Sequence, residues 1–447
     1  MSPAPVPPAR RDLLRAVALL PATGAAVVAG AAAGSHPWRR EPALRCEGVV
    51  IEADGAVCAL SPGTAAVYGP GTRVRASARG SEAASRQRRR RSGARLPESR
   101  WAGLADDALA DLLALTGPIL ATQGQPPTVF PTGAVVAGPV GGWRYTWPRD
   151  ASFAAAAFSA VGLRDEALAV LAHLAEVQRP DGGFEARYTA SGGVPDSRPA
   201  QGDGAGWMLW AAGRVMADGA GIDELGTVCG AGLVRAVGNL MALTDTPSHL
   251  PPASPDYWEV PERVLTLGTA APVLLGLEAA TALARAGLEL GVPAQALAER
   301  VAAVRNAMER NFAPAWGRHL RRDDVDAAIA LVLPPFTRPL AGARTVRQTA
   351  AARMHRPTGG LAPGAGWRDD GVSWTPETAL MAWSALSLGM EEEGARLLSW
   401  LEAHRTGAGA LPEKVVADGA PAGPAPLAWT CALILLATAS RASDPPS

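Results

Sequence analysis

The side chains best suited to chemistry lie in one short run, from Trp143 to Asp150. The run reads Trp-Arg-Tyr-Thr-Trp-Pro-Arg-Asp, and an apolar helical stretch over 151–161 follows it. Arg149 and Asp150 therefore stand at the start of a predicted helix, where free backbone N–H groups favour an acid. Aromatic rings cover the C–H faces of a sugar, and charged groups bind its hydroxyl groups. The run is typical of a site for a polyhydroxylated ring.

Two later loops each place a glutamate beside a residue that would shift its pKa. Glu259 directly follows Trp258, and a tryptophan desolvates a neighbouring acid and favours its protonated form, as a general acid requires. Glu413 precedes Lys414, the only lysine of the chain, and an adjacent cation keeps a carboxylate ionised, as a base or nucleophile requires. On spacing alone, a solvated loop glutamate and a surface Glu–Lys pair explain these two motifs better.

The balance of charge argues against a nucleic-acid partner. The chain of 447 residues carries 42 basic and 42 acidic residues. Up to Arg100 there are 16 basic and 7 acidic residues, so the larger remainder is mildly acidic. A run of arginines, 88–91, lies within a low-complexity stretch over 80–100. We expect this stretch to be a solvated linker, and a nucleic-acid-binding arm is the alternative.

The first residues have the pattern of an export signal. Arg10 and Arg11 precede an apolar stretch over 16–33 that ends in three alanines, a small-residue cleavage pattern. We expect a signal over 1–34 that uses the twin-arginine route and a secreted or cell-surface protein. A membrane helix is the alternative, although proline and glycine weaken it. No later stretch is a convincing span, so no stable membrane span is expected after signal removal.

Ahead of the arginine run, the chain is strand-like. The segments 49–51 and 57–60 are expected to form a hairpin within a small β segment and linker over 35–100. In an exported protein, Cys46 and Cys58 could pair across that hairpin. The cysteine spacing matches no zinc pattern, and no metal site is expected.

From Trp101 onward the periodicity of apolar residues is helical. Alternating strand patterns are scarce here, so paired helices closed into a ring are favoured over the whole of 101–447, with an open helical solenoid as the alternative. The helices are expected over 103–121, 150–162, 164–178, 201–217, 224–243, 266–288, 294–312, 323–333, 343–354, 376–389, 391–404 and 424–440.

The loops repeat a theme of carboxylate, tryptophan and arginine at helix junctions. Junctions at one end of a helical ring converge, and two carboxylates flanking an aromatic pocket fit glycoside hydrolysis. In this order the motifs resemble the glucoamylase-like glycoside hydrolases of family 15, over Leu104 to Ala437. The resemblance rests on Thr132–Pro139, Arg144–Asp150, Gln201–Gly204, Asp256–Glu259, Asp326–Ala327, Leu411–Glu413 and Pro426–Thr430.

The resemblance implies an all-α (α/α)6 barrel and an inverting hydrolase of terminal α-linked glucose. Glu259 matches the general acid and Glu413 the general base, and inversion predicts carboxyl groups roughly 6.5–9.5 Å apart. A monomer without cofactor or metal is expected, acting on an α-glucoside or glucan. The expected sugar-binding residues are Tyr145, Trp147, Arg149, Asp150, Asp256, Trp258 and Trp374.

The sequence departs from relatives at three points. Val260 stands where many have a second acid, Lys414 stands where glutamine is common, and the large N-terminal β-sandwich of many bacterial relatives is absent. These departures motivate a second hypothesis, a sugar-binding protein on the same scaffold without turnover. Starch-type glucans, trehalose, dextran-type linkages and short α-glucosides all remain open as ligands.

A third hypothesis is a terpene cyclase, another type of enzyme with a helical ring. The turn at 178–184 faintly resembles the Gln/Gly/aromatic turns of those proteins. However, it occurs once rather than as an array. The acids at 323–326 also have the wrong arrangement for an Asp-x-Asp-Asp motif. The glycoside hydrolase therefore remains the preferred interpretation.

Overall fold

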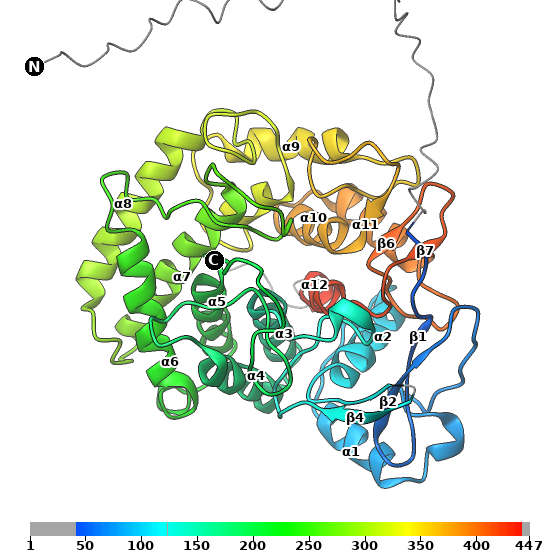
Figure 1. Ribbon diagram of the computed structural model, residues 1–447. Coiled ribbons are helices and arrows are strands. Elements are labelled where there is room, and N and C mark those ends of the chain that lie inside the picture. Colours follow the sequence, from blue (N-terminus) through cyan, green and yellow to red (C-terminus); the bar gives the residue numbers. More distant parts are fainter. Residues whose placement is uncertain (1–41, 123, 440–447) are drawn as a thin grey trace, which may run out of the picture. The chain divides into compact units, whose positions relative to one another are not determined.

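A computed structural model describes residues 42–439 except residue 123 (Figure 1). The chain from Pro42 onward forms one compact unit. The expected export signal over 1–34 lies outside the described residues.

Most helices lie where the apolar periodicity predicts them. The structure has α2 (Ala102–Ala114), α3 (Pro148–Ala160), α4 (Arg164–Val177), α5 (Gly204–Ala217), α6 (Ile222–Leu243), α7 (Leu267–Arg285), α8 (Ala294–Phe312), α9 (Ala343–Met354), α10 (Thr375–Ser387), α11 (Glu391–Ala403) and α12 (Ala428–Ala439). The stretch expected as a helix over 323–333 forms only a short 3-10 helix, η3 (Ala327–Val332), which begins where the Asp326 side chain accepts a hydrogen bond from the N–H of Ala328.

These helices close into a double ring (Figure 1). In the inner ring, α3 packs on α5, α5 on α7, α7 on η3, η3 on α10, α10 on α12, and α12 returns to α3. The elements α2, α4, α6, α8, α9 and α11 form the outer layer and each contacts an inner member. Because α12 packs on α3, the ring is closed. The predicted all-α (α/α)6 barrel is therefore confirmed, and the open solenoid is excluded.

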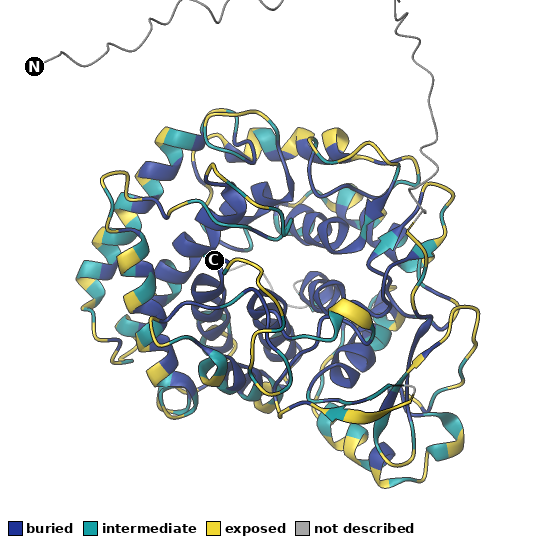
Figure 2. Ribbon diagram, in the orientation of Figure 1, coloured by how far each residue is buried: buried dark blue, intermediate teal, exposed yellow. Residues whose placement is uncertain are grey.

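Burial explains why the two layers differ in sequence. The inner helix α12 is buried at nearly every position and reads as a continuous apolar run. The outer helix α11 begins with three glutamates and buries one apolar stripe. Figure 2 shows the same contrast, with the inner helices dark blue and the outer ones partly teal and yellow. Inner and outer helices alternate along the chain, so the inner helices share one direction and begin at one end of the barrel.

Glycine permits the tightest contact between two inner helices. A Cβ on Gly206 of α5 would lie 2.2 Å from the carbonyl oxygen of Pro272 in α7, far inside van der Waals contact. Gly276 of α7 faces the same spot, with a built Cβ 2.6 Å from the Cα of Gly206. The obstacles are backbone atoms, so side-chain repacking cannot relieve such a clash.

Gly206→Ala should therefore lower the free energy of unfolding by about 1–3 kcal/mol, the usual cost of overpacking. Gly238→Ala is the matched control, because Gly238 is an exposed residue of α6 and a Cβ there meets nothing within 4 Å. That change should stabilise the protein by about 0.4–1 kcal/mol. Urea unfolding measures both. Equal effects at the two positions would contradict the assigned close packing of α5 and α7.

The prediction of a linker over 80–100 is wrong for residues 82–91. They form helix α1 (Glu82–Arg91), which begins where the Ser81 side chain accepts a hydrogen bond from a backbone N–H of the first turn. Arg90 binds both carboxylate oxygens of Glu166 in α4. The arginine run is therefore partly paired with the barrel rather than a free, solvated chain.

The expected hairpin is present, but Cys46 and Cys58 do not pair across it. Strands β1 (Gly48–Ile51) and β2 (Ala56–Leu60) pair antiparallel, and their register places Val50 opposite Cys58. Cys46 lies outside the paired residues, and its thiol donates to the carbonyl of Ala425 over 3.0 Å. Both cysteines are free thiols. The sequence left this pairing open, because spacing along the chain does not fix the register of a hairpin.

Short strands occur where the periodicity predicted helix or loop. The strands β3 (Ile119–Thr122) and β4 (Gln125–Val129) extend the first sheet, so α2 ends earlier than expected. A second sheet joins β5 (Ser373–Trp374), β6 (Lys414–Val415) and β7 (Pro421–Ala422). Its register pairs Trp374 with Lys414, which ties the start of α10 to the loop that carries Glu413.

Among the described residues, α6 and α7 are long and apolar enough for a membrane span by length and composition alone. Both pack within the barrel: α7 contacts α5 and α8, and α6 contacts α4 and α5. The core helices of soluble proteins commonly have the same length and composition, so this finding is weak evidence of a span.

Candidate active site

A pocket opens where several inner helices begin. It has a volume of about 230 Å³, below the roughly 300–1,000 Å³ of sites for drug-sized ligands, so it suits a small ring. The starts of α3, α10 and α12 contribute to its wall, together with the loop before α7. The lining residues include Trp143, Trp147, Arg149, Asp150, Arg187, Arg198, Trp258, Glu259, Trp374, Glu377, Glu413 and Trp429.

The start of α3 supplies an arginine and an acid. Arg149 and Asp150 are buried in the first turn, and an Arg149 nitrogen lies 3.2 Å from Asp150 Oδ2. A second Arg149 nitrogen donates to Gln201 Oε1 over 3.4 Å, and the guanidinium stacks 4.8 Å from the ring centre of Trp429. Burial raises the pKa of Asp150 to about 6, although Arg149 opposes the shift. The pair presents a donor and an acceptor to the same space.

Glu259 projects into the pocket from a strained turn. Its φ of 54° is unusual for a residue other than glycine, and such strain is often found at functional sites. The turn closes with a hydrogen bond from its N–H to the carbonyl of Asp256. One carboxylate oxygen lies 3.7 Å from Arg149, and the other accepts a hydrogen bond from Arg198. Two arginines therefore hold this carboxyl group, and its side chain is 26% exposed.

Glu413 is the more deeply buried of the two expected catalytic residues. The indole of Trp143 donates to its Oε1 over 3.1 Å, and the Lys414 ammonium lies 3.1 Å from its Oε2. Burial raises the pKa of Glu413, while Lys414 and the Trp143 hydrogen bond act in the opposite direction. The Lys414 ammonium nitrogen also lies 4.2 Å from the ring centre of Trp374, which lines the pocket as well.

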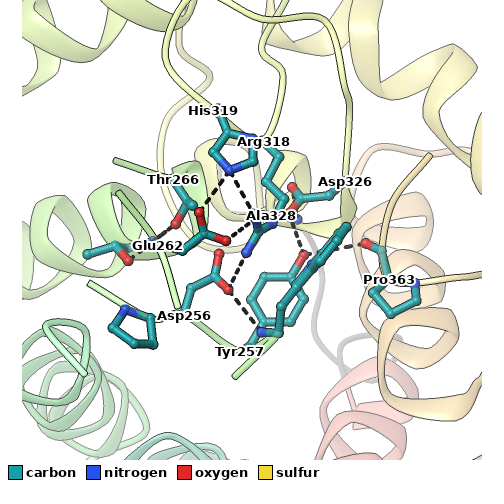
Figure 3. A network of polar contacts seen from close by, with 12 residues as sticks. Asp256, Tyr257, Glu262, Thr266, Arg318, His319, Asp326, Ala328 and Pro363 are labelled. Atoms are coloured by element: carbon teal, nitrogen blue, oxygen red, sulfur yellow. Dashed lines mark hydrogen bonds and ion pairs between the residues drawn. The ribbon is translucent and has the colours of Figure 1, made fainter. Parts of the chain in front are cut away.

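A buried ionic network supports the loop of Glu259 from behind (Figure 3). Arg318 donates to Asp256 Oδ1 over 2.7 Å, lies 3.5 Å from Asp326 and also binds Glu262. The Asp256 carboxylate accepts a further hydrogen bond from the backbone N–H of Trp258. The Arg318 guanidinium stacks 3.9 Å from the centre of the Trp258 ring. The network therefore fixes the backbone and side chain of the residue that precedes Glu259.

Seven of the nine residues expected from the sequence line the pocket; Tyr145 and Asp256 do not. Tyr145 lies beside it, with Arg187 stacked 4.5 Å from its ring centre. Asp256 belongs to the network behind Trp258. In the structure, both residues lie next to residues that line the pocket, Tyr145 beside Arg187 and Asp256 beside Trp258.

Other residues that line the pocket were not assigned to the site from the sequence. Arg187 and Arg198 come from the long loop between α4 and α5, and Trp429 comes from the first turn of α12. Glu377, in the first turn of α10, is a further acid in the pocket wall. The sequence signal that Glu377 belongs to the site was weak, because acids are common in the first turn of any helix. Among the described residues, no three histidine, cysteine or acidic side chains gather in a way that could hold a metal ion.

Burial raises the pKa of Glu377 from 4.5 to about 8, and the nearby Glu413 adds to the shift. The folded protein thus holds this proton more tightly than the unfolded chain. Its contribution to stability is complete below pH 4.5 and is lost as the pH rises through about 8.

Glu377→Gln removes this titration. The stability of the variant relative to wild type should therefore increase between pH 5 and pH 8, by about 1.4 kcal/mol per pH unit at most. Urea unfolding at pH 5, 6.5 and 8 measures the trend. Glu392→Gln, at an exposed position of α11, is the control and should show no such trend. If the difference in unfolding free energy between Glu377→Gln and wild type stayed constant with pH, the raised pKa assigned to Glu377 would be contradicted.

Solved structures of known proteins resemble the fold of this chain. No family model and no curated protein matches the sequence. Among solved structures, a glycosidase is 22% identical and aligns over 68% of this chain and 90% of its own, with a TM-score of 0.57. The glucoamylase from Saccharomycopsis fibuligera is 14% identical over 78% of this chain and 96% of its own, with a TM-score of 0.57.

A third solved structure, a glycoside hydrolase family 15 glucoamylase from Hypocrea jecorina, is 16% identical over 76% of this chain and 71% of its own, with a TM-score of 0.55. The chain has the glucoamylase-like glycoside hydrolase fold. At these identities the likeness concerns the fold alone, and the chemistry of the pocket depends on its own residues. Within this fold, the pocket lies where the inner helices begin.

Proposed function

We propose that the protein is an inverting glycoside hydrolase that removes terminal α-linked glucose from oligo- or polysaccharides. Glu259 is the general acid that protonates the leaving oxygen, and Glu413 is the general base that activates water on the opposite face of the ring. The observation that carries the proposal is the presence of both glutamates, from loops far apart in sequence, in one pocket lined by tryptophan and arginine.

The surroundings of Glu413 support its role as the base. The Trp143 indole fixes one carboxylate oxygen, which orients the other. A base works best when its pKa approaches the operating pH, and burial moves the pKa of Glu413 in that direction. Lys414 opposes the effect of burial on the pKa of Glu413, because a nearby cation favours the charged form.

The contacts of Glu259 set a condition on its role as the acid. A general acid must reach the leaving oxygen of the substrate, and Arg198 already occupies one carboxylate oxygen of Glu259. The role therefore requires a bound sugar to displace Arg198. This residue is suited to displacement, because its side chain is 44% exposed and comes from the loop between α4 and α5.

The sugar is held by the start of α3. Arg149 and Asp150 offer donors and an acceptor to ring hydroxyls, and the tryptophans cover the C–H faces. Glucose is the sugar we favour, since one structural neighbour is a glycosidase variant in complex with glucose, at 22% identity and a TM-score of 0.56.

The experiment is incubation of the purified protein with starch-type glucans, trehalose, dextran-type and short α-glucosides, with the matching β-linked glucosides as controls. We expect glucose release from at least one α-linked substrate and from no β-linked one. Absence of glucose release from every α-glucoside would contradict the proposed hydrolysis.

A sugar-binding protein without turnover is the second candidate, and the contact between Lys414 and Glu413 favours it, because a cation lowers the basicity of a carboxylate. It predicts oligosaccharide binding by calorimetry without release of any reducing sugar.

We also propose export by the twin-arginine route, supported by the sequence pattern of residues 1–34 alone. Replacement of Arg10 and Arg11 by lysine should retain the protein inside the producing cell. Unchanged secretion of that variant would contradict this route.

A further inference from the structure

Glu377 is a pocket acid that the proposed mechanism does not use. It lies in the first turn of α10, its side chain lines the pocket, and the residue is 2% exposed. Its Oε2 is buried and makes no hydrogen bond within the described part of the chain. Buried polar atoms almost always have a partner, so an unpaired oxygen in a pocket wall indicates a partner that is not part of the chain.

The position of Glu377 relative to Glu413 is fixed by backbone contacts. The N–H of Thr375, two residues before Glu377, donates to the carbonyl of Glu413 over 3.1 Å. The Thr375 hydroxyl donates to the carbonyl of Pro412 over 2.6 Å, and Trp374 pairs with Lys414 in the small sheet. The start of α10 and the loop of Glu413 therefore form one rigid wall that carries both carboxyl groups.

The cations of the pocket are already engaged by other groups. Arg149 binds Asp150, Gln201 and Glu259, and Lys414 binds Glu413. Glu377 has no ion pair within the described residues. Burial and the charge of Glu413 raise its pKa, and the more distant charges of Arg149 and Lys414 offset only part of this shift. A carboxyl group in this setting is stable as the neutral acid, which both donates and accepts a hydrogen bond. A sugar hydroxyl has the same two capacities and is its natural complement.

We propose that Glu377 is a sugar-binding residue of this pocket and that its carboxyl group hydrogen-bonds a hydroxyl of the ring held between Glu259 and Glu413. The proposal rests on the proposed function, because it assumes that the ligand is a sugar. It assigns to α10 a role in selecting the hydroxyl pattern of that sugar.

The test compares glucose binding by calorimetry for the full chain and three variants at Glu377. Glu377→Leu removes the hydrogen bond, and we expect a loss of affinity of about tenfold or more. Glu377→Asp withdraws the carboxyl group by one methylene and should lose about fivefold. Glu377→Gln keeps a donor and an acceptor at the same reach and should stay within about threefold of wild type.

Deoxyglucoses identify the hydroxyl and separate binding from a merely structural role. One of the 2-, 3-, 4- and 6-deoxy sugars lacks the hydroxyl that Glu377 binds. Its affinity for the wild-type protein should be about as low as the affinity of glucose for Glu377→Leu. The Glu377→Leu substitution should lower the affinity for that deoxy sugar little further. A structural defect would weaken all the sugars alike. If Glu377→Leu does not fold, the same test is made with Glu377→Asp and Glu377→Gln, by comparing their affinities for glucose and for the deoxy sugars.

Equal glucose affinity in wild type, Asp and Gln variants would overturn the assignment of Glu377 and leave the proposed function intact. A wild-type protein that neither binds glucose nor releases it from any glucoside would overturn both. The two failures are therefore distinguishable.

Discussion

Glu413→Gln will lower the rate of glucose release by about 10²–10⁴-fold, the usual contribution of a general base. The amide has nearly the same shape and still accepts a hydrogen bond from Trp143, but it cannot take a proton from water. The affinity for glucose should change by less than about threefold, because the residues that we assign to sugar binding remain. Release kinetics and calorimetry on the same preparation measure the two quantities.

Glu402→Gln is the matched control, since Glu402 belongs to α11 and does not line the pocket. It should leave the rate of release unchanged. If Glu413→Gln kept wild-type activity, Glu413 could not be the base. If it lost rate and glucose affinity in equal measure, its main role would be binding.

The second large effect concerns the buried ionic network. Arg318→Met will lower the free energy of unfolding by about 3–5 kcal/mol, because it leaves Asp256 and Asp326 buried without their cation. Methionine keeps much of the apolar length of the side chain, so the lost volume is small. Burial already raises the pKa of Asp326 to about 7 in the presence of Arg318. Urea unfolding at pH 7 measures the change.

Arg89→Met is the control for an ion pair in solvent. Arg89 and Glu82 of α1 are paired, but their side chains are 65% and 71% exposed. Such pairs contribute about 0–1 kcal/mol, so this variant should be nearly as stable as wild type. Similar losses for Arg318→Met and Arg89→Met would show that burial of the network has been misjudged.

The sequence predicted the barrel well because its two layers have different patterns. The continuous apolar run of α12 and the single stripe of α11 follow directly from burial on several sides and on one side. Neighbours in the chain also carry the site: Trp147, Arg149 and Asp150 enter the pocket together because the first turn of α3 orients them. Local sequence was sufficient where the contacts are local.

What the sequence could not predict depends on distant contacts. The arginine run indicated a linker, because no feature of the neighbouring sequence predicts that Arg90 pairs with Glu166, 76 positions away. Glu377 was missed because its burial comes from its position beside the loop of Glu413 rather than from its neighbours in sequence. Asp256 was expected to touch the sugar, yet Arg318 draws it into the network behind the pocket.

The anomer first released from an α-linked substrate tests the central claim most directly. Proton nuclear magnetic resonance, recorded within the first minutes of reaction, distinguishes the two anomers of free glucose before they interconvert. A general base at Glu413 that activates water on the face opposite the leaving group predicts β-glucose as the initial product. Initial α-glucose would contradict inversion and the pairing of Glu259 with Glu413 as acid and base.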